Sequence, residues 1–220
     1  MDNLQRLLDN NRRWVAAMTA RDPQFFTRRA GKQEPRFLFI GCSDSRVPAE
    51  ALTGALPGEM FVHRNIANQV FPADLNVLSV LQFAIEVLHV REVIVCGHYE
   101  CGGVRAAMGT EPLGLVDNWL GSIRHVMRLH RAELDAVEDS ETRLRRLVDL
   151  NVIEQVYNLS RTPVVQRAWQ RAPTPMVHGL VYNLHDGLLH RLAAGINSND
   201  KADALAAAEP TRAEISGGHR

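Results

Sequence analysis

The hydrophobic pattern of the chain alternates short apolar runs with longer segments of helical period. Apolar residues recur every three or four positions over residues 2–20 and again over 74–90, which predicts two amphipathic helices. Short apolar runs that stand between glycine, proline or polar residues predict buried strands at residues 36–41, 60–63, 93–96 and 176–182. Continuous apolar strands separated by helices predict an α/β fold with a mainly parallel central sheet flanked by helices.

The second half of the chain is predicted to be helical before it returns to the sheet. Helical spacing recurs over three segments, residues 115–136, 141–160 and 163–171. The turn His185-Asp186-Gly187 lies between the last predicted strand and another apolar run, which predicts a C-terminal antiparallel edge. From Asn197 onward small and polar residues dominate, so we expect a short helix at most and then a frayed tail.

The domain organisation is expected to be simple. A chain of 220 residues is long enough to bury a substantial core, and no repeat or linker divides it. We therefore expect residues 1–220 to form a single domain, with residues 1–35 as an N-terminal helical arm and residues from about 197 to 220 as a polar tail.

Composition narrows the class of protein without identifying it. The formal net charge is zero and no long basic run occurs, so neither nucleic acid nor an anionic membrane is an expected partner. The segment Met1-Asp2-Asn3-Leu4 lacks the pattern of a signal peptide, and no apolar stretch is long enough to span a bilayer. Three cysteines suit reduced thiols better than a disulfide framework, which predicts a cytoplasmic protein.

Two short segments carry the candidate chemistry, Cys42-Ser43-Asp44-Ser45-Arg46 and His98-Tyr99-Glu100-Cys101. Each begins where a predicted strand ends, and the carboxyl ends of neighbouring strands meet at one edge of an α/β sheet. Two thiolates and an imidazole are good ligands for tetrahedral zinc and leave the fourth position open, as in catalytic sites. The spacing therefore predicts a site for one Zn²⁺ at Cys42, His98 and Cys101.

Asp44 and Arg46 lie beside the first predicted ligand. Two thiolates cancel the charge of a zinc ion, so such a site needs help from its surroundings to acidify a bound water molecule. Asp44 is expected to accept a hydrogen bond from that water, and Arg46 to hold the carboxylate through two parallel hydrogen bonds. Asp44 alternatively fills the open position as a fourth ligand, which would be a closed state.

Cys96 is the competing fourth ligand. It lies two residues before His98, so in a continuous strand both side chains would point to one face. A closed site of Cys42, Cys96, His98 and Cys101 would be structural and inert. We expect Gly97 to end the strand and to leave Cys96 in the core.

These motifs resemble those of the β-class carbonic anhydrases, and the similarity to bacterial members extends from about Gly31 to Leu189. The resemblance implies that Cys42, His98 and Cys101 bind zinc and that Asp44 and Arg46 form the catalytic pair. It also implies the reaction, in which zinc-bound hydroxide attacks carbon dioxide to give bicarbonate and a proton. An apolar substrate pocket, shared across a homodimer, is implied at Gln33, Phe61, Ile66, Phe83 and Gly102.

A second bicarbonate site occurs in one subgroup of the family, where Trp, Arg and Tyr lie with a nearby Glu and control the movement of the aspartate onto zinc. The corresponding residues here are Phe39, Arg64, Tyr182 and Glu50. Phenylalanine keeps the aromatic bulk of tryptophan and loses its N–H donor. The resemblance implies an allosteric bicarbonate site at these residues, with this departure from the pattern.

Two other functions remain open at this point. Some proteins of this fold hydrolyse carbon disulfide or carbonyl sulfide at the same kind of zinc site. A structural Cys3His zinc protein is the second alternative, and a substitution of Cys96 separates it from the enzymes. The apolar face of the first predicted helix and the resemblance together predict an obligate homodimer that pairs into a dimer of dimers.

Overall fold

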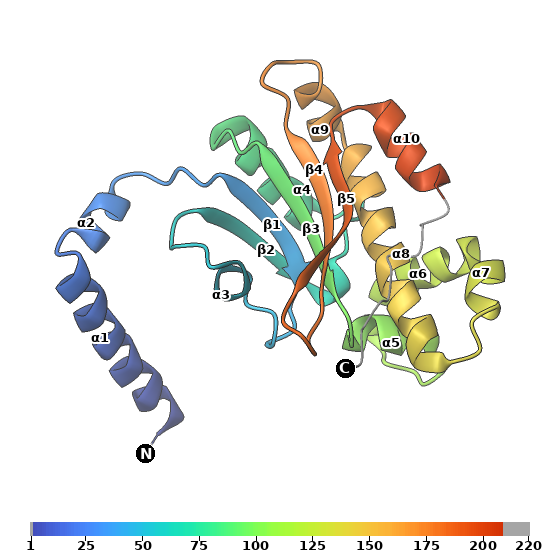
Figure 1. Cartoon of the computed structure of the whole chain (residues 1–220), viewed down its shortest axis with the longest axis horizontal. Coiled ribbons are helices and arrows are strands. Elements are labelled where there is room, and N and C mark those ends of the chain that lie inside the picture. The colour runs from blue at the N-terminus through green and yellow to red at the C-terminus, as the bar shows by residue number, and fades with distance from the viewer. Residues whose placement is uncertain (1, 209–220) are drawn as a thin grey trace, which may run out of the picture. The chain divides into compact units, whose positions relative to one another are not determined.

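The computed structural model of the chain describes residues 2–208 and consists of two compact units. The first unit extends to Glu34 and the second begins at Pro35. Figure 1 labels the elements of both units.

The N-terminal unit contains two helices, α1 (Asn3–Arg21) and α2 (Phe25–Ala30). The side chain of Asp2 accepts a hydrogen bond from the Leu4 N–H group at 3.1 Å and so caps α1. The helix predicted at 2–20 is confirmed, but none of its residues is buried. Trp14 packs edge-on against the rings of Phe25 and Phe26, so the two helices contact each other through aromatic side chains.

The second unit is built on a five-stranded sheet with the order β2-β1-β3-β4-β5. The first four strands in this order pair in parallel, and β5 pairs antiparallel with β4. The mainly parallel sheet and its antiparallel C-terminal edge are therefore confirmed. The strands are β1 (Phe37–Cys42), β2 (Met60–Asn65), β3 (Glu92–His98), β4 (Met176–Tyr182) and β5 (Leu189–Ile196).

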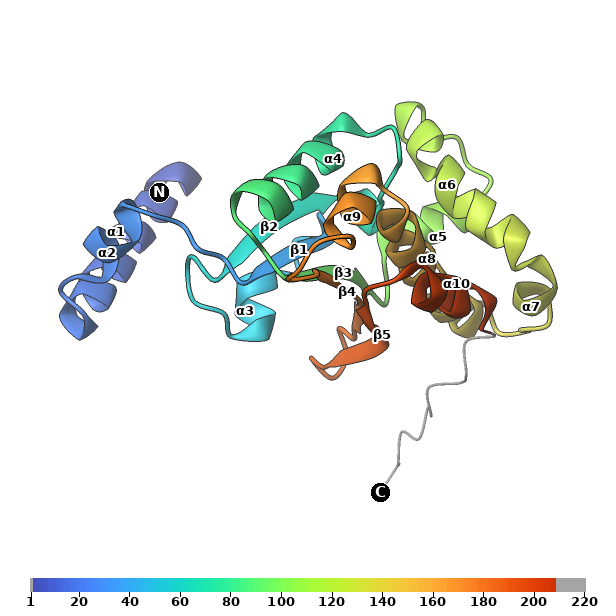
Figure 2. The same cartoon turned by 90° about the horizontal axis from the view of Figure 1, so that it is seen from above.

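The helices of the second unit cover the two faces of the sheet unequally. Helices α4, α8 and α9 lie on one face, whereas the short α3 lies on the other (Figure 2). The helices of the unit are α3 (Ala49–Thr53), α4 (Leu75–Gln82), α5 (Gly102–Met108), α6 (Leu115–Leu129), α7 (Arg131–Asp135), α8 (Ser140–Ser160), α9 (Pro163–Ala168) and α10 (Asn199–Ala207).

Several predicted helices are interrupted in the structure. The helix expected at 74–90 begins as α4 and continues as one wider turn, η2 (Phe83–Val87). The helix expected at 115–136 is divided into α6 and α7 at His130, whose φ of −107° and ψ of 28° are not helical. The short helix expected after Asn197 is α10, and the tail predicted beyond it lies outside the described residues from 209 onward.

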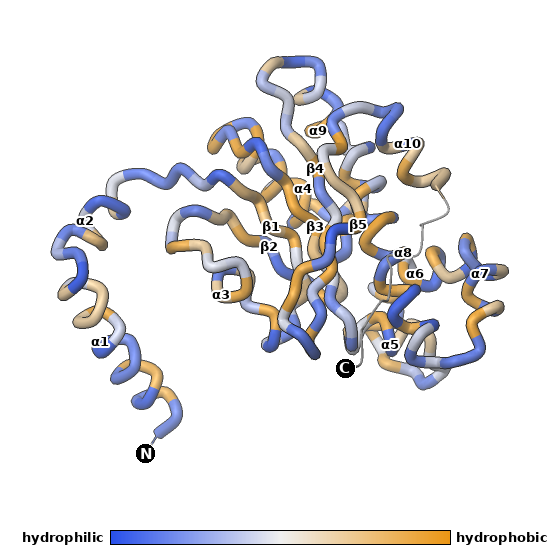
Figure 3. Tube along the Cα trace, viewed as in Figure 1, coloured by the Kyte–Doolittle hydropathy of each residue, from blue (hydrophilic) through white to orange (hydrophobic). Residues whose placement is uncertain are grey.

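Helix α8 supplies most of the packing that positions the site. It contacts β3, β4 and β5 as well as α5 and α6. Its buried side chains include Leu144, Leu147, Val148 and Val156, each at most 1% exposed. Figure 3 shows that hydrophobic residues concentrate in the central strands and on the helices around them. Among residues 2–208 no helix is both long enough and apolar enough to cross a bilayer.

Candidate metal centre

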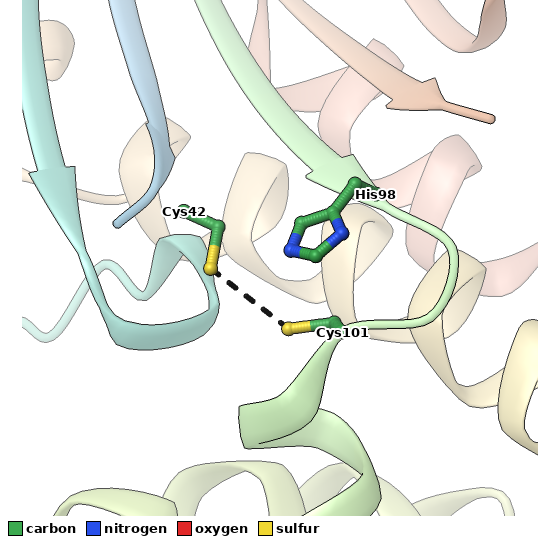
Figure 4. A group of neighbouring side chains, drawn as sticks. All are labelled: Cys42, His98 and Cys101. Atoms are coloured by element: carbon green, nitrogen blue, oxygen red, sulfur yellow. Dashed lines mark hydrogen bonds between the residues drawn. The ribbon is translucent and has the colours of Figure 1, made fainter. Parts of the chain in front are cut away.

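Two strand ends and one helix start bring a Cys-His-Cys group together. Cys42 is the last residue of β1, His98 is the last residue of β3, and Cys101 immediately precedes α5. Because β1 and β3 are neighbouring parallel strands, their carboxyl ends meet at the same edge. One ligand atom from each residue lies within 4.8 Å of the others, and all three side chains are buried. Figure 4 shows the two thiols and the imidazole facing one another.

The geometry of the two thiols fits a tetrahedral metal ion. Cys42 Sγ and Cys101 Sγ are 3.9 Å apart. Two sulfur atoms bound to one tetrahedral zinc lie roughly 3.8 Å apart, given Zn–S bonds of about 2.3 Å. The observed separation therefore matches what a shared metal ion requires.

The orientation of His98 also fits metal binding. Nδ1 lies 2.8 Å from the carbonyl oxygen of Tyr99, which favours the tautomer that carries its proton on Nδ1. Nε2 then presents a lone pair, and this buried atom has no hydrogen-bond partner among the described residues. A buried nitrogen acceptor without a partner is costly unless it binds a metal or a donor. The Cys-His-Cys group is therefore one that could hold a metal ion.

Hydrogen bonds around Cys42 favour the thiolate form that a metal ion needs. The pKa of Cys42 falls to about 4, chiefly because the Cys101 thiol donates a hydrogen bond to it. The N–H groups of Ala67 and Asp44 contribute to the same shift. The pKa of Cys101 is raised, because it holds the shared proton and is buried beside the Cys42 thiolate.

Asp44 and Arg46 form the ion pair expected beside the ligands. Arg46 Nε lies 2.9 Å from Asp44 Oδ1 and Nη2 lies 2.7 Å from Oδ2, so the contact is bidentate. The Arg46 N–H group donates a further hydrogen bond to Oδ1 at 2.9 Å. These bonds hold the pKa of Asp44 well below its usual range. Asp44 Oδ2 is 3.7 Å from His98 Nε2, which places the carboxylate beside the Cys-His-Cys group.

Cys96 does not belong to this group, but the reason we expected was wrong. The strand does not end at Gly97, since β3 continues through His98. Cys96 instead packs with Phe39 and Ile94 in a separate core cluster. Burial raises the pKa of the Cys96 thiol to about 12, so it stays protonated.

Gly97 has a packing role in place of the one we predicted for it. A Cβ atom at this position would lie 2.5 Å from Val152 Cγ2 on α8. The absence of a side chain therefore lets α8 lie close to the end of β3, next to His98.

The residues of the predicted substrate pocket lie in both units. Gln33 belongs to the N-terminal unit, and the others belong to the second unit. The rings of Phe61 and Phe83 stack with their centroids 5.9 Å apart. Ile66 and Phe83 are 40% and 42% exposed, and a Cβ atom on Gly102 would meet no atom within 4 Å. Ile66, Phe83 and Gly102 thus face open space on the second unit.

The residues of the predicted bicarbonate site are only partly grouped. Phe39 is fully buried and shares a core cluster with the partly buried Tyr182. Arg64 donates hydrogen bonds to the carbonyl oxygens of Cys42 and Asp44, which attaches it to the ligand loop. Glu50 is exposed on α3. A regulatory role for these residues stays a prediction.

Sequence reasoning missed a loop that contacts the centre through its backbone. The 65–69 loop consists of Asn65, the last residue of β2, and the four residues after it, and it includes the short turn η1 (Ile66–Asn68). The N–H group of Ala67 donates a hydrogen bond to Cys42 Sγ at 3.4 Å. The polar residues Asn65, Asn68 and Gln69 directly after a strand were the available signal for such a loop.

Comparisons with known proteins decide the family. A family model described as carbonic anhydrase matches residues 37–189. A solved structure of a β-carbonic anhydrase from Coccomyxa, in complex with acetazolamide, aligns with a TM-score of 0.90 and 37% identity, covering 94% of each chain. This chain belongs to the β-class carbonic anhydrase family. It is therefore an enzyme, and the resemblance found in its sequence is confirmed.

Other relatives agree with this assignment. The carbonic anhydrase of Emericella nidulans is 50% identical over 187 residues, which are 85% of this chain and 82% of the relative. A structure described among two tetrameric β-carbonic anhydrases from Sordaria macrospora aligns with a TM-score of 0.84 and 36% identity. That alignment covers 87% of this chain and 98% of the other. The similarity to the family thus spans nearly the whole of the sheet and its helices.

Proposed function

We propose that this chain catalyses the reversible hydration of carbon dioxide to bicarbonate and a proton, with one Zn²⁺ bound by Cys42, His98 and Cys101. The observation that carries the proposal is the buried Cys-His-Cys group, whose ligand atoms lie within 4.8 Å of one another. When bound, zinc would supply a Lewis acid with an open position, where a water molecule becomes acidic enough to attack carbon dioxide.

Asp44 is the residue proposed to orient the reacting water. Its carboxylate is held by Arg46 and its depressed pKa keeps it ionised, so it accepts hydrogen bonds and does not donate them. A water molecule at the open position of the metal would donate a hydrogen bond to the Asp44 carboxylate. This hydrogen bond would align one lone pair of the water oxygen toward the substrate. Arg46 is therefore proposed to act through Asp44 by fixing its direction.

The same carboxylate is proposed as the fourth ligand of a closed state. Nitrogen and oxygen ligands with bonds of about 2.0 Å to a tetrahedral zinc lie roughly 3.3 Å apart. Asp44 Oδ2 is already 3.7 Å from His98 Nε2, so a short movement of the carboxylate would suffice. Such a movement breaks the hydrogen bond from Arg46 to Oδ2, which ties the closed state to this ion pair.

The substrate is proposed to bind beside Ile66 and Gly102, against the stacked rings of Phe61 and Phe83. A role for Gln33 stays a prediction from the resemblance. Carbon dioxide is uncharged and has no dipole, so it needs an apolar wall and few hydrogen bonds. The exposed apolar surface of Ile66 and Phe83 supports this location of the substrate.

Control by bicarbonate is proposed at a second site, which consists of Phe39, Glu50, Arg64 and Tyr182. The hydrogen bond of Arg64 to the carbonyl oxygen of Asp44 supports a connection between this site and the Cys-His-Cys group.

Assembly as a homodimer, and then as a dimer of dimers, is part of the proposal. Helix α1 buries none of its residues, although several of them are large and apolar. Their exposed fractions lie between 42% and 61% for Leu4, Leu7, Leu8 and Trp14. A helix with such an apolar face needs a partner surface. The structures from Sordaria macrospora are described as tetrameric, which supports assembly without defining it here. A cytoplasmic location stays a prediction.

The proposal is tested by stopped-flow hydration of carbon dioxide, normalised to bound zinc. The unmodified chain is expected to turn over rapidly, and Asp44→Asn is expected to lose roughly 10²–10⁴-fold in rate while it keeps its zinc. Absence of hydration across mildly acidic to alkaline pH, with one zinc per chain still bound, would contradict the proposal. Carbonyl sulfide and carbon disulfide, assayed in parallel, would then identify the alternative hydrolase.

A further inference from the structure

The 65–69 loop reaches the metal centre in an unfavourable backbone conformation. Ala67 and Asn68 have φ values of 60° and 49°, in the left-handed region that residues with a side chain adopt at an energetic cost. This conformation points the N–H group of Ala67 at Cys42 Sγ. A strained backbone conformation persists only where contacts from surrounding residues hold it. Two side chains from other helices supply such contacts and are called the supports of the loop.

The first support is Trp119 on α6. Its indole Nε1–H donates a hydrogen bond of 2.8 Å to the carbonyl oxygen of Ile66. That carbonyl and the N–H group of Ala67 belong to the same peptide group and point in opposite directions. The indole therefore orients the peptide group that donates to Cys42, and it polarises the N–H bond in the same sense.

The second support is Asn151 on α8, which is 1% exposed. Its Nδ2 donates to the carbonyl oxygen of Ala67 at 3.1 Å, on the other side of the same residue. Its Oδ1 accepts hydrogen bonds from Gln69 Nε2 at 2.9 Å and from Gln155 Nε2 at 3.1 Å. Asn151 thus clamps the second peptide group of Ala67 and is itself fixed by two amides.

These residues hold the hydrogen bond from the Ala67 N–H group to Cys42 Sγ. This hydrogen bond matters because a zinc ion with two thiolate ligands acidifies bound water only weakly. Two thiolates cancel the charge of the metal ion and reduce its power to acidify water. An N–H group that donates a hydrogen bond to a thiolate withdraws negative charge from the sulfur atom. The sulfur atom then donates less negative charge to the metal ion. Hydrogen bonds to metal ligands tune metal centres in this way.

We propose that Trp119 and Asn151 are positioning residues of the metal centre. By clamping the peptide groups on either side of Ala67, they keep its N–H group on Cys42 Sγ and preserve the Lewis acidity of the bound metal. The inference rests on the proposed function to the extent that Cys42 is a metal ligand. It adds two residues, from α6 and α8, that do not contact the metal or the substrate.

Trp119→Phe is the variant that tests the proposal most cleanly. It removes the indole donor and keeps an aromatic ring against Phe71, whose ring centroid lies 4.7 Å from that of Trp119. Trp169→Phe is the matched control, because Trp169 Nε1 donates to the carbonyl oxygen of Pro175 at 3.0 Å in another part of the fold. Both variants lose one hydrogen bond from tryptophan to a backbone carbonyl.

The first readout is the ultraviolet sulfur-to-metal charge-transfer band of the cobalt(II)-loaded protein. A thiolate without its N–H donor has higher-energy lone pairs, so the band should move to lower energy in Trp119→Phe and stay in place in Trp169→Phe. The second readout is zinc affinity by competition with a chelator. Loss of a hydrogen-bond partner that orients a metal ligand typically costs 10–100-fold, because the ligand is then less firmly positioned. We expect roughly a tenfold loss in Trp119→Phe alone.

Asn151→Ala extends the test to the second support, and we expect it to shift the band in the same direction. Leu159→Ala, a truncation at a fully buried position of the same helix, controls for loss of stability, because Leu159 belongs to a different core cluster from Ala67. Identical bands and affinities in Trp119→Phe, Trp169→Phe and the unmodified chain would overturn the proposal. A chain that shows thiolate bands with cobalt but hydrates no carbon dioxide would contradict the proposed function, and the band comparison would still decide the positioning role.

Discussion

Arg46 holds both carboxylate oxygens of Asp44 while one of them, Oδ2, lies only 3.7 Å from Nε2 of His98. Asp44 is therefore placed between a cation that orients it and the Cys-His-Cys group that could hold a metal ion. The side chain of Arg46 is 55% exposed and that of Asp44 is 16% exposed. A surface ion pair contributes little to stability, so the value of this contact lies in the direction that it gives the carboxylate.

Arg46→Lys is expected to lower hydration per bound zinc by roughly 10–100-fold, because lysine keeps the charge but cannot form two parallel hydrogen bonds. Zinc content should not change. The measurement is stopped-flow hydration together with metal analysis. Arg124→Lys, which alters an ion pair with Asp117 on α6, is the matched control and should retain full activity. Equal rates for the two variants would remove Arg46 from the mechanism.

Cys96→Ser is expected to retain one zinc per chain and the resistance of the unmodified chain to chelators. Cys96 lies outside the Cys-His-Cys group and its thiol stays protonated, so it offers no thiolate to the metal. Cys42→Ser should lose most of its zinc under the same conditions. Zinc release from Cys96→Ser, measured with a colorimetric chelator, would establish the structural Cys3His site in place of the catalytic one.

Asp149→Asn is expected to change how stability depends on pH. Burial raises the pKa of Asp149 from its ordinary 3.8 to about 6, although Tyr99 and nearby arginine side chains favour the ionised form. The folded chain therefore binds this proton more tightly than the unfolded chain, and the stability that protonation contributes is lost as pH rises through about 6. Asparagine is neutral at every pH, so the Asp149→Asn variant does not lose stability through ionisation at this position.

The free energy of unfolding of Asp149→Asn, relative to the unmodified chain, should thus increase by about 1–1.5 kcal/mol between pH 5 and pH 8. Urea unfolding of the two zinc-saturated proteins at both pH values measures this difference, and contributions from zinc cancel in the comparison. A difference that is constant with pH would show that Asp149 does not titrate in this interval.

Leu7→Glu on α1 is expected to convert the assembled protein to monomers at low micromolar concentration. Leu7 is 58% exposed, so a charge there costs the isolated chain little but would be buried in an interface. Ala16→Glu adds the same charge on the opposite side of the helix, at 100° per residue, and should leave assembly intact. Size-exclusion chromatography with light scattering makes the comparison. An unmodified zinc-loaded chain that is monomeric and fully active would contradict the predicted dimer.

The local pattern of the sequence was enough to predict most of the sheet and the Cys-His-Cys group that could hold a metal ion. Strands were predicted correctly because buried parallel strands consist of continuous apolar runs, as in residues 36–41 and 93–96. The group at Cys42, His98 and Cys101 was predictable because each ligand lies at or just beyond the end of a strand, and such ends meet at one edge. Boundaries were less accurate, since the break at His130 depends on backbone angles that no periodicity reveals.

What the sequence by itself determined is the chemistry, namely which donors lie next to which strand ends. Only the tertiary structure decided which distant groups complete the site. Gly97 looked like the end of a strand, but it is the position where α8 packs closely on β3. Trp119 and Asn151 lie 53 and 84 residues beyond the loop positions whose carbonyls they bind. Hydrogen bonds over such separations depend on how α6 and α8 pack against the sheet, and helical periodicity specifies which side chains face inward but not which atoms they meet.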